Sequence, residues 1–122
     1  MGARSQRKGR TAEIELSRIL QGYGIHAEPG QAASYGSTPD ITGVPGIHCE
    51  VKRCQQLRIP DWMEQAAGDA KKFKDGVPAV FFRRNREPWF VVMALEDWMA
   101  IYKQEREGDN VLSEKREKET FH

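Results

Sequence analysis

Near the start of the chain, apolar residues recur every three or four positions, as they do on one face of a helix. These residues are Leu16, Ile19, Leu20 and Tyr23. Their spacing predicts an amphipathic helix from Arg10 to about Tyr23, and the adjacent Gly22 and Gly24 favour its end. Residues 1–9 are polar and basic, so we expect them to form a flexible arm.

The pattern changes to strict alternation between Ile47 and Lys52, which is typical of a strand. One face carries Ile47, Cys49 and Val51, and the other carries His48, Glu50 and Lys52. We therefore expect a strand that buries one face and presents the second to a cleft or to solvent. Upstream, we predict a short extended piece at 25–28, a polar loop at 29–39 and a brief strand that begins at Ile41.

Helical and extended patterns alternate in the second half of the chain. Apolar residues at helical spacing are Trp62, Ala66, Ala70 and Phe73. They predict a second helix from Asp61 to about Gly76. Residues 77–83 and 89–93 are rich in Val and Phe and predict a hairpin. A last amphipathic helix is expected from Leu95 to about residue 103.

Together these elements predict a single small mixed α/β domain at residues 10–104, with a central sheet covered by helices on both faces. The charged tail at 105–122 is expected to be mobile, or ordered only against a partner. The 122 residues carry a formal net charge of only +1, so the overall charge does not indicate nucleic acid. Local basic patches are the more informative signal.

Hydropathy and cysteine content indicate the compartment. No apolar run is long enough to cross a membrane, and the start lacks the apolar segment of a secretory signal. Cys49 and Cys54 form no disulfide framework, so we expect a cytoplasmic protein without membrane association. With His48 they suggest a zinc site, but the lack of a second Cys/His pair disfavours it.

The chemistry-bearing stretch is Pro39-Asp40, then nine intervening residues, then Glu50-Val51-Lys52. Two adjacent strands would bring both carboxylates close together, and such a pair needs a cation such as Mg²⁺ or Mn²⁺ between its oxygens. Lys52 projects from the same face as Glu50, where its ammonium suits a phosphate oxygen or an attacking water. A Glu-X-Lys pair is also common on solvated strands, and Asp after Pro is common in turns, so the spacing alone is only suggestive.

These residues resemble the signature of the PD-(D/E)XK nuclease superfamily, and most nearly its Holliday-junction resolvase branch of phages and prophages. Three further segments extend the likeness. Lys8-Gly9 followed by Glu13 resembles the opening segment of that branch, Ser34-Tyr35-Gly36-Ser37 its active-site loop, and Ile47 to Lys52 its central strand. The similarity runs from about Lys8 to Tyr102. It implies a restriction-endonuclease-like mixed sheet flanked by helices.

The resemblance also implies roles for individual residues. Glu13, Asp40 and Glu50 would be metal ligands, joined by the carbonyl of Val51, and Lys52 would be the catalytic lysine. Ser37 would contact the scissile phosphate or the metal-bound water, and Gln65 would support the site. Periodicity alone leaves Glu15 as a rival of Glu13, and the alignment through Lys8-Gly9 favours Glu13.

DNA contacts are expected from the arginines of the predicted hairpin and of the segment after the central strand. The candidates are Arg53, Arg83, Arg84 and Arg86. They would supply salt-dependent phosphate contacts without base readout. Trp62, Trp89 and Trp98 lie at core spacing, so we expect burial rather than base stacking.

Our functional hypothesis is a metal-dependent endonuclease that cuts branched DNA, such as a four-way junction, by phosphodiester hydrolysis. Two symmetric cuts would require a homodimer with paired sites. One alternative is a nicking, flap or repair nuclease of the same superfamily. Another is a DNA-binding or assembly protein that keeps the fold without catalysis, which the intact set of polar positions disfavours.

Overall fold

The structure is a computed structural model that describes the backbone of residues 3–30 and 38–120 and the side chains of residues 9–30 and 38–107. Its elements are α1 (Ala3–Gly22), β1 (Glu28–Pro29), β2 (Ile41–Thr42), β3 (Ile47–Arg53), α2 (Ile59–Phe73), β4 (Val77–Arg83), β5 (Phe90–Met93) and α3 (Leu95–Thr120). Ser37 lies outside the described residues.

The five strands form one sheet in the order β1-β2-β3-β4-β5. Neighbouring strands are antiparallel except for β3 and β4, which run parallel with Glu50 opposite Val80. A parallel pair needs a crossover connection, and α2 supplies it. The sheet is therefore mixed, as the sequence predicted, and β3 lies at its centre.

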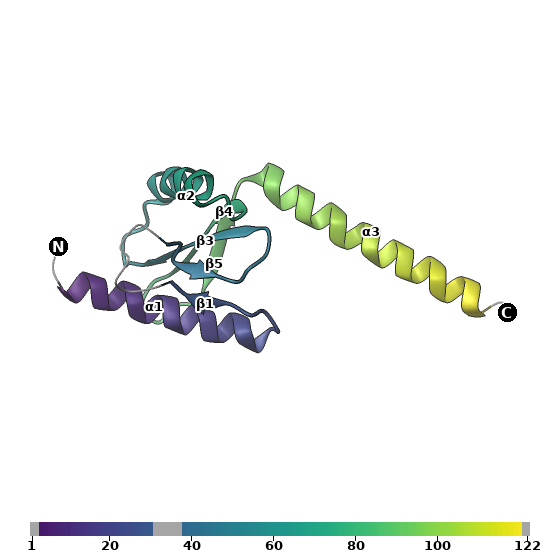
Figure 1. Cartoon of the computed structure of the whole chain (residues 1–122), viewed down its shortest axis with the longest axis horizontal. Coiled ribbons are helices and arrows are strands. Elements are labelled where there is room, and N and C mark those ends of the chain that lie inside the picture. Colours follow the sequence, from purple (N-terminus) through teal and green to yellow (C-terminus); the bar gives the residue numbers. More distant parts are fainter. Residues whose placement is uncertain (1–2, 31–37, 121–122) are drawn as a thin grey trace.

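Helices cover both faces of this sheet (Figure 1). On one face, Ala12 and Leu16 of α1 pack with Cys49 and Val51 of β3 in an apolar core. On the other, Trp62 and Ala66 of α2 pack with Val80 and Phe82 of β4. The alternation along β3 is confirmed, but both of its faces are buried, because the face with His48 and Glu50 lies under α2. A buried polar face on a central strand needs a specific explanation.

Several predicted boundaries were wrong. Helix α1 begins at Ala3, so residues 3–9 are helical where we expected a flexible arm. Helix α2 begins at Ile59, with Pro60 in its first turn and no side-chain cap. Helix α3 continues to Thr120, through the segment predicted to be a mobile tail. The charged, polar ends of α1 and α3 contain few apolar residues whose spacing could indicate a helix. The periodicity of apolar residues therefore did not predict these helical turns.

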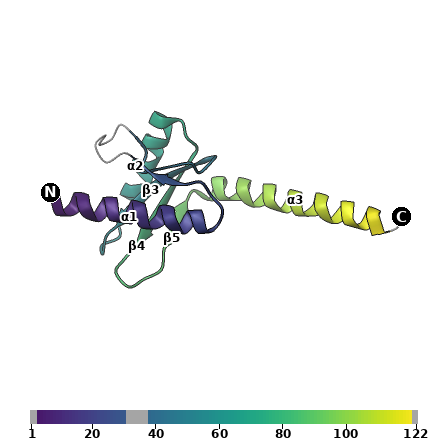
Figure 2. The same ribbon diagram turned by 60° about the horizontal axis from the view of Figure 1, so that its bottom comes forward.

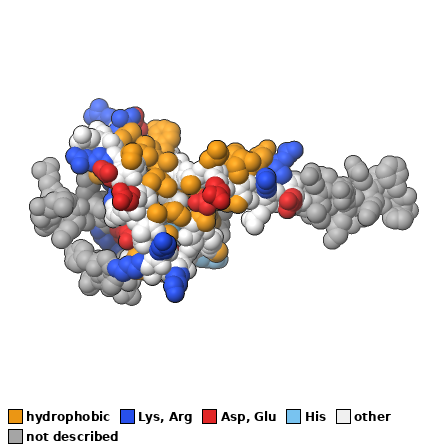
Figure 3. All heavy atoms as spheres, turned by 90° about the horizontal axis from the view of Figure 1, so that it is seen from above, with side chains coloured by type: hydrophobic (Ala, Val, Ile, Leu, Met, Phe, Trp, Pro, Cys, Tyr) orange, Lys and Arg blue, Asp and Glu red, His pale blue; other side chains and the backbone are white. Residues whose placement is uncertain are grey.

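Helix α3 extends away from the rest of the molecule (Figures 1 and 2). Its described surface near the domain carries apolar side chains (Figure 3), including Trp98, which is 48% exposed. Burial was therefore the wrong prediction for Trp98, whereas Trp62 is buried and Trp89 is half-buried. Among the described helices, none has a stretch both long and apolar enough to span a membrane.

Candidate functional site

Asp40 is fixed beside the central strand by its backbone and its carboxylate. It directly precedes β2, whose Ile41 pairs with Cys49 of β3. The backbone N–H of Val51 donates to Oδ2 of Asp40 at 2.9 Å. On the other side, the N–H of Gly30 donates to the carbonyl of Asp40 at 2.8 Å. The carboxylate of Glu50 thus comes from β3, and that of Asp40 from the residue just before the adjacent β2, close to the arrangement that the spacing predicted.

A cavity of about 260 Å³ opens at this point between α1, β3 and α2. Its lining residues are Glu13, Thr38, Pro39, Asp40, Glu50, Val51, Lys52, Gln65, Asp69 and Phe73. The structure therefore brings together six of the site residues proposed from the sequence, from Glu13 on the first helix to Gln65 on the second. Polar side chains gathered in one concave site are typical of an active site.

Glu13 and its rival Glu15 point to different surroundings. Glu13 lines the cavity, and its Oε2 lies 3.9 Å from the Arg10 guanidinium. Glu15 accepts hydrogen bonds from Arg83 and, at 3.1 Å, from Nε1 of Trp89. Glu15 is held by Arg83 of β4 and by Trp89, so of the two glutamates only Glu13 lines the cavity with Asp40 and Glu50.

The cavity disfavours negative charge on two of its carboxyl groups. Burial, followed by the charge of Asp40, raises the pKa of Glu13 to about 7, although Arg10 opposes the shift. Burial, a hydrogen bond with Asp69 and the charges of Asp40 and Asp69 raise the pKa of Glu50 to about 9. Such shifts arise where acids share a desolvated site without a compensating cation. They mark this cavity as a place suited to bind positive charge.

Lys52 projects into the same cavity and is oriented by α2. Its Nζ donates a hydrogen bond to Oε1 of Gln65 at 2.7 Å. Gln65 lies on the helix surface rather than in the core, and its supporting role stays a prediction. A lysine held in this way presents its remaining N–H groups toward the cavity.

Comparison with known proteins identifies the family. The family profile described as "Phage putative PDDEXK endonuclease" matches residues 4–121. The chain belongs to this family. The matched residues include both terminal helices and every residue that lines the cavity. A search of curated proteins found no significant match.

A solved structure supports the same fold for this phage PD-(D/E)XK endonuclease family member. It is Archaeoglobus fulgidus Hjc, described as a Holliday junction resolvase from an archaeal hyperthermophile. The two chains are 25% identical with a TM-score of 0.52, over 70% of this chain and 72% of Hjc. The predicted restriction-endonuclease-like mixed α/β fold is therefore confirmed.

Behind the cavity, in contact with Glu50, lies a histidine that the sequence analysis considered only as a zinc ligand. His48 is fully buried, and its Nε2 lies 2.8 Å from Oε1 of Glu50. Its Nδ1 lies 2.8 and 2.9 Å from the two oxygens of Asp75, and Phe73 stacks on the ring. The polar face of β3 is thus explained, because His48 links the buried Glu50 to a carboxylate near the surface.

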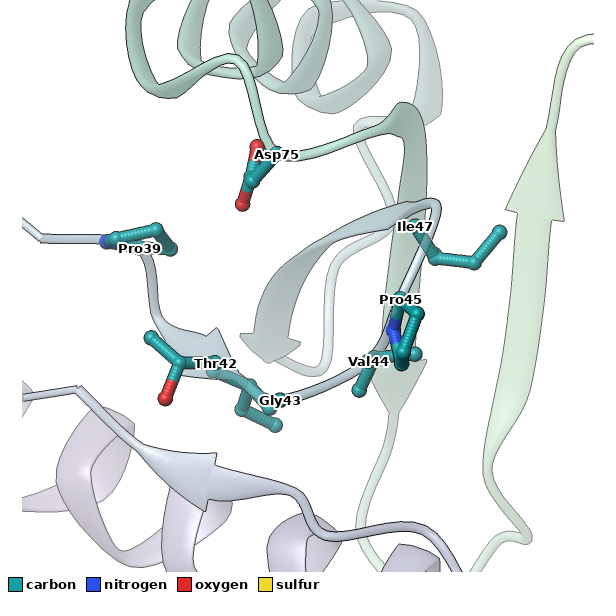
Figure 4. A pocket seen from close by; sticks show the side chains of 8 residues that line it. Pro39, Thr42, Gly43, Val44, Pro45, Ile47 and Asp75 are labelled. Carbon is teal, nitrogen blue, oxygen red and sulfur yellow. The ribbon is translucent and has the colours of Figure 1, made fainter.

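Asp75 reaches His48 from the turn after α2. Lys74 adopts a left-handed conformation, and its N–H caps the helix by donating to the carbonyl of Ala70. The turn leaves Asp75 at the rim of a second, apolar cavity formed by Pro39 and the β2–β3 connection (Figure 4). Sequence reasoning missed Asp75 because no local pattern connects it with a strand 27 residues away.

Asp69 on α2 was also missed. Single ligand atoms of His48, Glu50 and Asp69 lie within 4.8 Å of one another, in a group suited to hold a metal ion. Gln65 and Asp69 are four residues apart and therefore lie on one face of α2. This spacing was the signal from which Asp69 could have been predicted as a site residue. The zinc hypothesis finds no support among the described residues, since Cys49 faces the α1 core, away from His48.

The arginines proposed for DNA contact lie outside the cavity lining. Arg53 donates to the carbonyl of Arg83 at 3.5 Å, and Arg83 is bonded to Glu15. Arg84 donates to Glu87 within the β4–β5 turn, while Arg86 is exposed there with a φ of 62°. Arg53 and Arg83 therefore have structural contacts of their own, and Arg86 is the most accessible of the group.

Proposed function

We propose that this endonuclease hydrolyses phosphodiester bonds in DNA at the cavity between α1, β3 and α2, with Mg²⁺ or Mn²⁺ as cofactor. The observation that carries the proposal is the convergence of Glu13, Asp40 and Glu50, from three different elements, around one desolvated space. Two of these acids have raised pKa values, so the site is electrostatically incomplete without a cation.

The residues of the cavity fit a hard divalent cation. The carboxylates of Glu13, Asp40 and Glu50 and the carbonyl of Val51 would supply oxygen ligands, which Mg²⁺ and Mn²⁺ prefer. When bound, the metal would acidify a water molecule and stabilise the charge that develops on the phosphate. The hydrogen bond between Val51 and Asp40 holds the latter carboxylate in place for this purpose.

Lys52 provides the remaining charge of the site. Its ammonium, held by Gln65, would contact a non-bridging phosphate oxygen or orient the attacking water. Ser37 would assist at the scissile phosphate. The arginines of the β4–β5 turn, above all Arg86, together with Arg53, would hold the DNA backbone through salt-dependent contacts.

We further propose branched DNA, in particular a four-way junction, as the substrate and a homodimer as the active form. The likeness to Hjc supports this substrate, and symmetric cutting of a junction needs two sites. A cytoplasmic location stays a prediction from the unpaired thiols of Cys49 and Cys54.

Cleavage assays with matched variants test this function. The purified protein should cut a four-way junction in Mg²⁺ or Mn²⁺ and should cut a flap and a linear duplex of the same length much more slowly. Glu13→Gln, Glu50→Ala and Lys52→Ala should each lower the rate by at least about 100-fold, because the catalytic groups act as a unit. Glu15→Gln, two residues from Glu13, is the control and should retain most activity.

The outcomes separate the hypotheses. Equal cutting of all three DNAs would retain the nuclease and reject the junction substrate. Binding of junctions without cutting in either metal would reject catalysis and leave a DNA-binding protein. Loss of activity in Glu15→Gln but not in Glu13→Gln would move the site away from the cavity described above.

A further inference from the structure

His48 is completely buried, and the proposed hydrolysis gives it no catalytic step. It lies on the polar face of β3, where its side chain is 0% exposed. Its Nδ1 lies 2.8 and 2.9 Å from the two oxygens of Asp75, in the turn after α2 (Figure 4). Because a carboxylate only accepts hydrogen bonds, Asp75 fixes the proton of the neutral ring on Nδ1. The lone pair of the ring is therefore left on Nε2.

The lone pair of Nε2 faces two carboxyl groups. Oε1 of Glu50 lies 2.8 Å from Nε2. One ligand atom from each of His48, Glu50 and Asp69 lies within 4.8 Å of the other two. A histidine whose second ring nitrogen donates to a carboxylate, as that of His48 does to Asp75, is the usual form of a metal-binding histidine. The four side chains thus have the arrangement of three metal ligands and one outer partner.

The distances fit a tetrahedral ion. Bonds of about 2.0–2.1 Å from Zn²⁺ to nitrogen and oxygen place neighbouring ligand atoms roughly 3.3 Å apart. This separation lies between the 2.8 Å that joins Nε2 to Glu50 and the 4.8 Å that bounds the whole group. Small rotations of the side chains would bring all three atoms to bonding distance. Glu50 and Asp69 also line the cavity, which gives the ion a path of entry.

The ligand chemistry selects the class of cation. An imidazole nitrogen suits Zn²⁺ and other transition ions, whereas Mg²⁺ prefers an octahedron of oxygens. The catalytic metal proposed above has oxygen ligands alone and makes no use of His48 or Asp69. Because Oε1 of Glu50 faces His48, the second oxygen of this carboxylate remains for the catalytic metal. The two sites therefore differ in their ligands and share only Glu50.

We propose that His48, Glu50 and Asp69 bind Zn²⁺, with Asp75 as the outer partner that orients His48. Neither cysteine of the chain takes part, in contrast to the zinc site considered from the sequence. The ion would join α2 to β3 at the inner wall of the cavity. Because only the folded chain brings these ligands together, bound Zn²⁺ stabilises the folded state. The location of the site rests on the four side chains and not on the proposed cleavage of DNA.

Calorimetric titration of the untagged, full-length protein with Zn²⁺ tests the proposal. Mg²⁺ is present in excess, so that sites made only of oxygens are filled. Wild-type protein should bind one Zn²⁺ ion. His48→Asn and Asp69→Asn should each weaken this binding by at least about 100-fold, more than loss of an outer partner typically does. Asp69 is half-buried, so Asp69→Asn keeps the test decisive where a change at the buried His48 disturbs folding, which circular dichroism reveals.

The controls separate this site from others. His26 and Cys54 are exposed and offer the side chains that bind zinc adventitiously, so His26→Asn and Cys54→Ser should bind Zn²⁺ as the wild type does. Asp40→Asn should lose Mn²⁺ binding and largely retain Zn²⁺ binding. In that variant Zn²⁺ should raise the thermal midpoint by several degrees, and it should leave the midpoint of Asp69→Asn unchanged.

Each result decides. A wild type that binds no Zn²⁺ in excess Mg²⁺ overturns the proposal, and so does binding that His48→Asn and Asp69→Asn leave intact. Loss of binding in His26→Asn or Cys54→Ser also overturns it, in favour of an adventitious surface site. Loss of Zn²⁺ in Asp40→Asn would assign the ion to the oxygen site instead. A protein that binds Zn²⁺ through His48 and Asp69 but cuts no DNA in Mg²⁺ or Mn²⁺ would reject the proposed function and leave the zinc site standing.

Discussion

At the residue scale, the centre of the molecule is a carboxyl group that the fold buries. Glu50 is 3% exposed and lies between His48, Asp69 and the charge of Asp40. An apolar residue at this position of β3 would pack under α2 without such a cost. A buried acid that lowers stability in this way is typical of an active site.

The raised pKa values predict how stability depends on pH without metal. Burial in the folded state raises the pKa of Glu13 from 4.5 to about 7 and that of Glu50 from 4.5 to about 9. Between those limits the folded state binds more protons, so stability falls as pH rises. We expect the thermal midpoint in EDTA to drop by several degrees from about pH 6 to about pH 8.5.

The control is Glu50→Gln, which should flatten this dependence and raise the midpoint at the alkaline end. Saturating Mn²⁺ should have the same effect on the wild type, because the cation stabilises the ionised carboxylates of the folded state. A midpoint that rises with pH in EDTA would contradict the account of the cavity.

The pair formed by His48 and Asp75 leads to a second expectation at this scale. Asp75 fixes the ring of His48, which in turn holds Glu50 in place. Asp75→Ala should therefore raise the Mn²⁺ concentration needed for half-maximal cleavage by about 10-fold, as loss of an outer partner of a ligand typically does. Asp61→Ala, an exposed acid in the first turn of α2, is the control. An unchanged metal requirement in Asp75→Ala would mean that His48 does not orient Glu50.

At the element scale, the sequence predicted what regular periodicity encodes. The alternation in β3 correctly separated the Cys49 face from the Glu50 face, and the strand spacing brought Asp40 beside Glu50. The choice of Glu13 came from family resemblance, since Glu13 and Glu15 differ only in tertiary contacts with Arg10, Arg83 and Trp89. Asp69 and Asp75 were missed for the same reason, because helix packing rather than local pattern brings them to β3.

Gly30 provides a prediction about the connection of these elements. A Cβ on Gly30 would lie 2.2 Å from the carbonyl oxygen of Pro39, which adjoins Asp40. Gly30→Ala should displace the segment that carries Asp40 and lower the rate of cleavage. It should also lower the free energy of unfolding in urea by roughly 1–3 kcal/mol. Gly68→Ala is the matched control, because its Cβ meets open space within α2. It should stabilise the protein by about 0.5–1 kcal/mol, and equal effects of the two substitutions would contradict this geometry.

At the scale of the whole molecule, the described chain consists of a sheet with its covering helices, which form the cavity, and of helix α3, which extends away from them (Figure 1). This shape could not be predicted from the pattern of apolar residues, because α3 is 26 residues long and continues to Thr120 through charged sequence in which that pattern has ended. The match to the phage endonuclease family covers the residues of this helix.

The central claim is that Glu13, Asp40 and Glu50 hold one catalytic metal. A crystal of the protein soaked in Mn²⁺ and measured at the manganese absorption edge tests it most directly. The account predicts an anomalous peak between the carboxylates of Asp40 and Glu50, within coordination distance of Glu13. A peak on His48 and Asp69 without Asp40, a peak beside Glu15, or the absence of any peak from the cavity would contradict it.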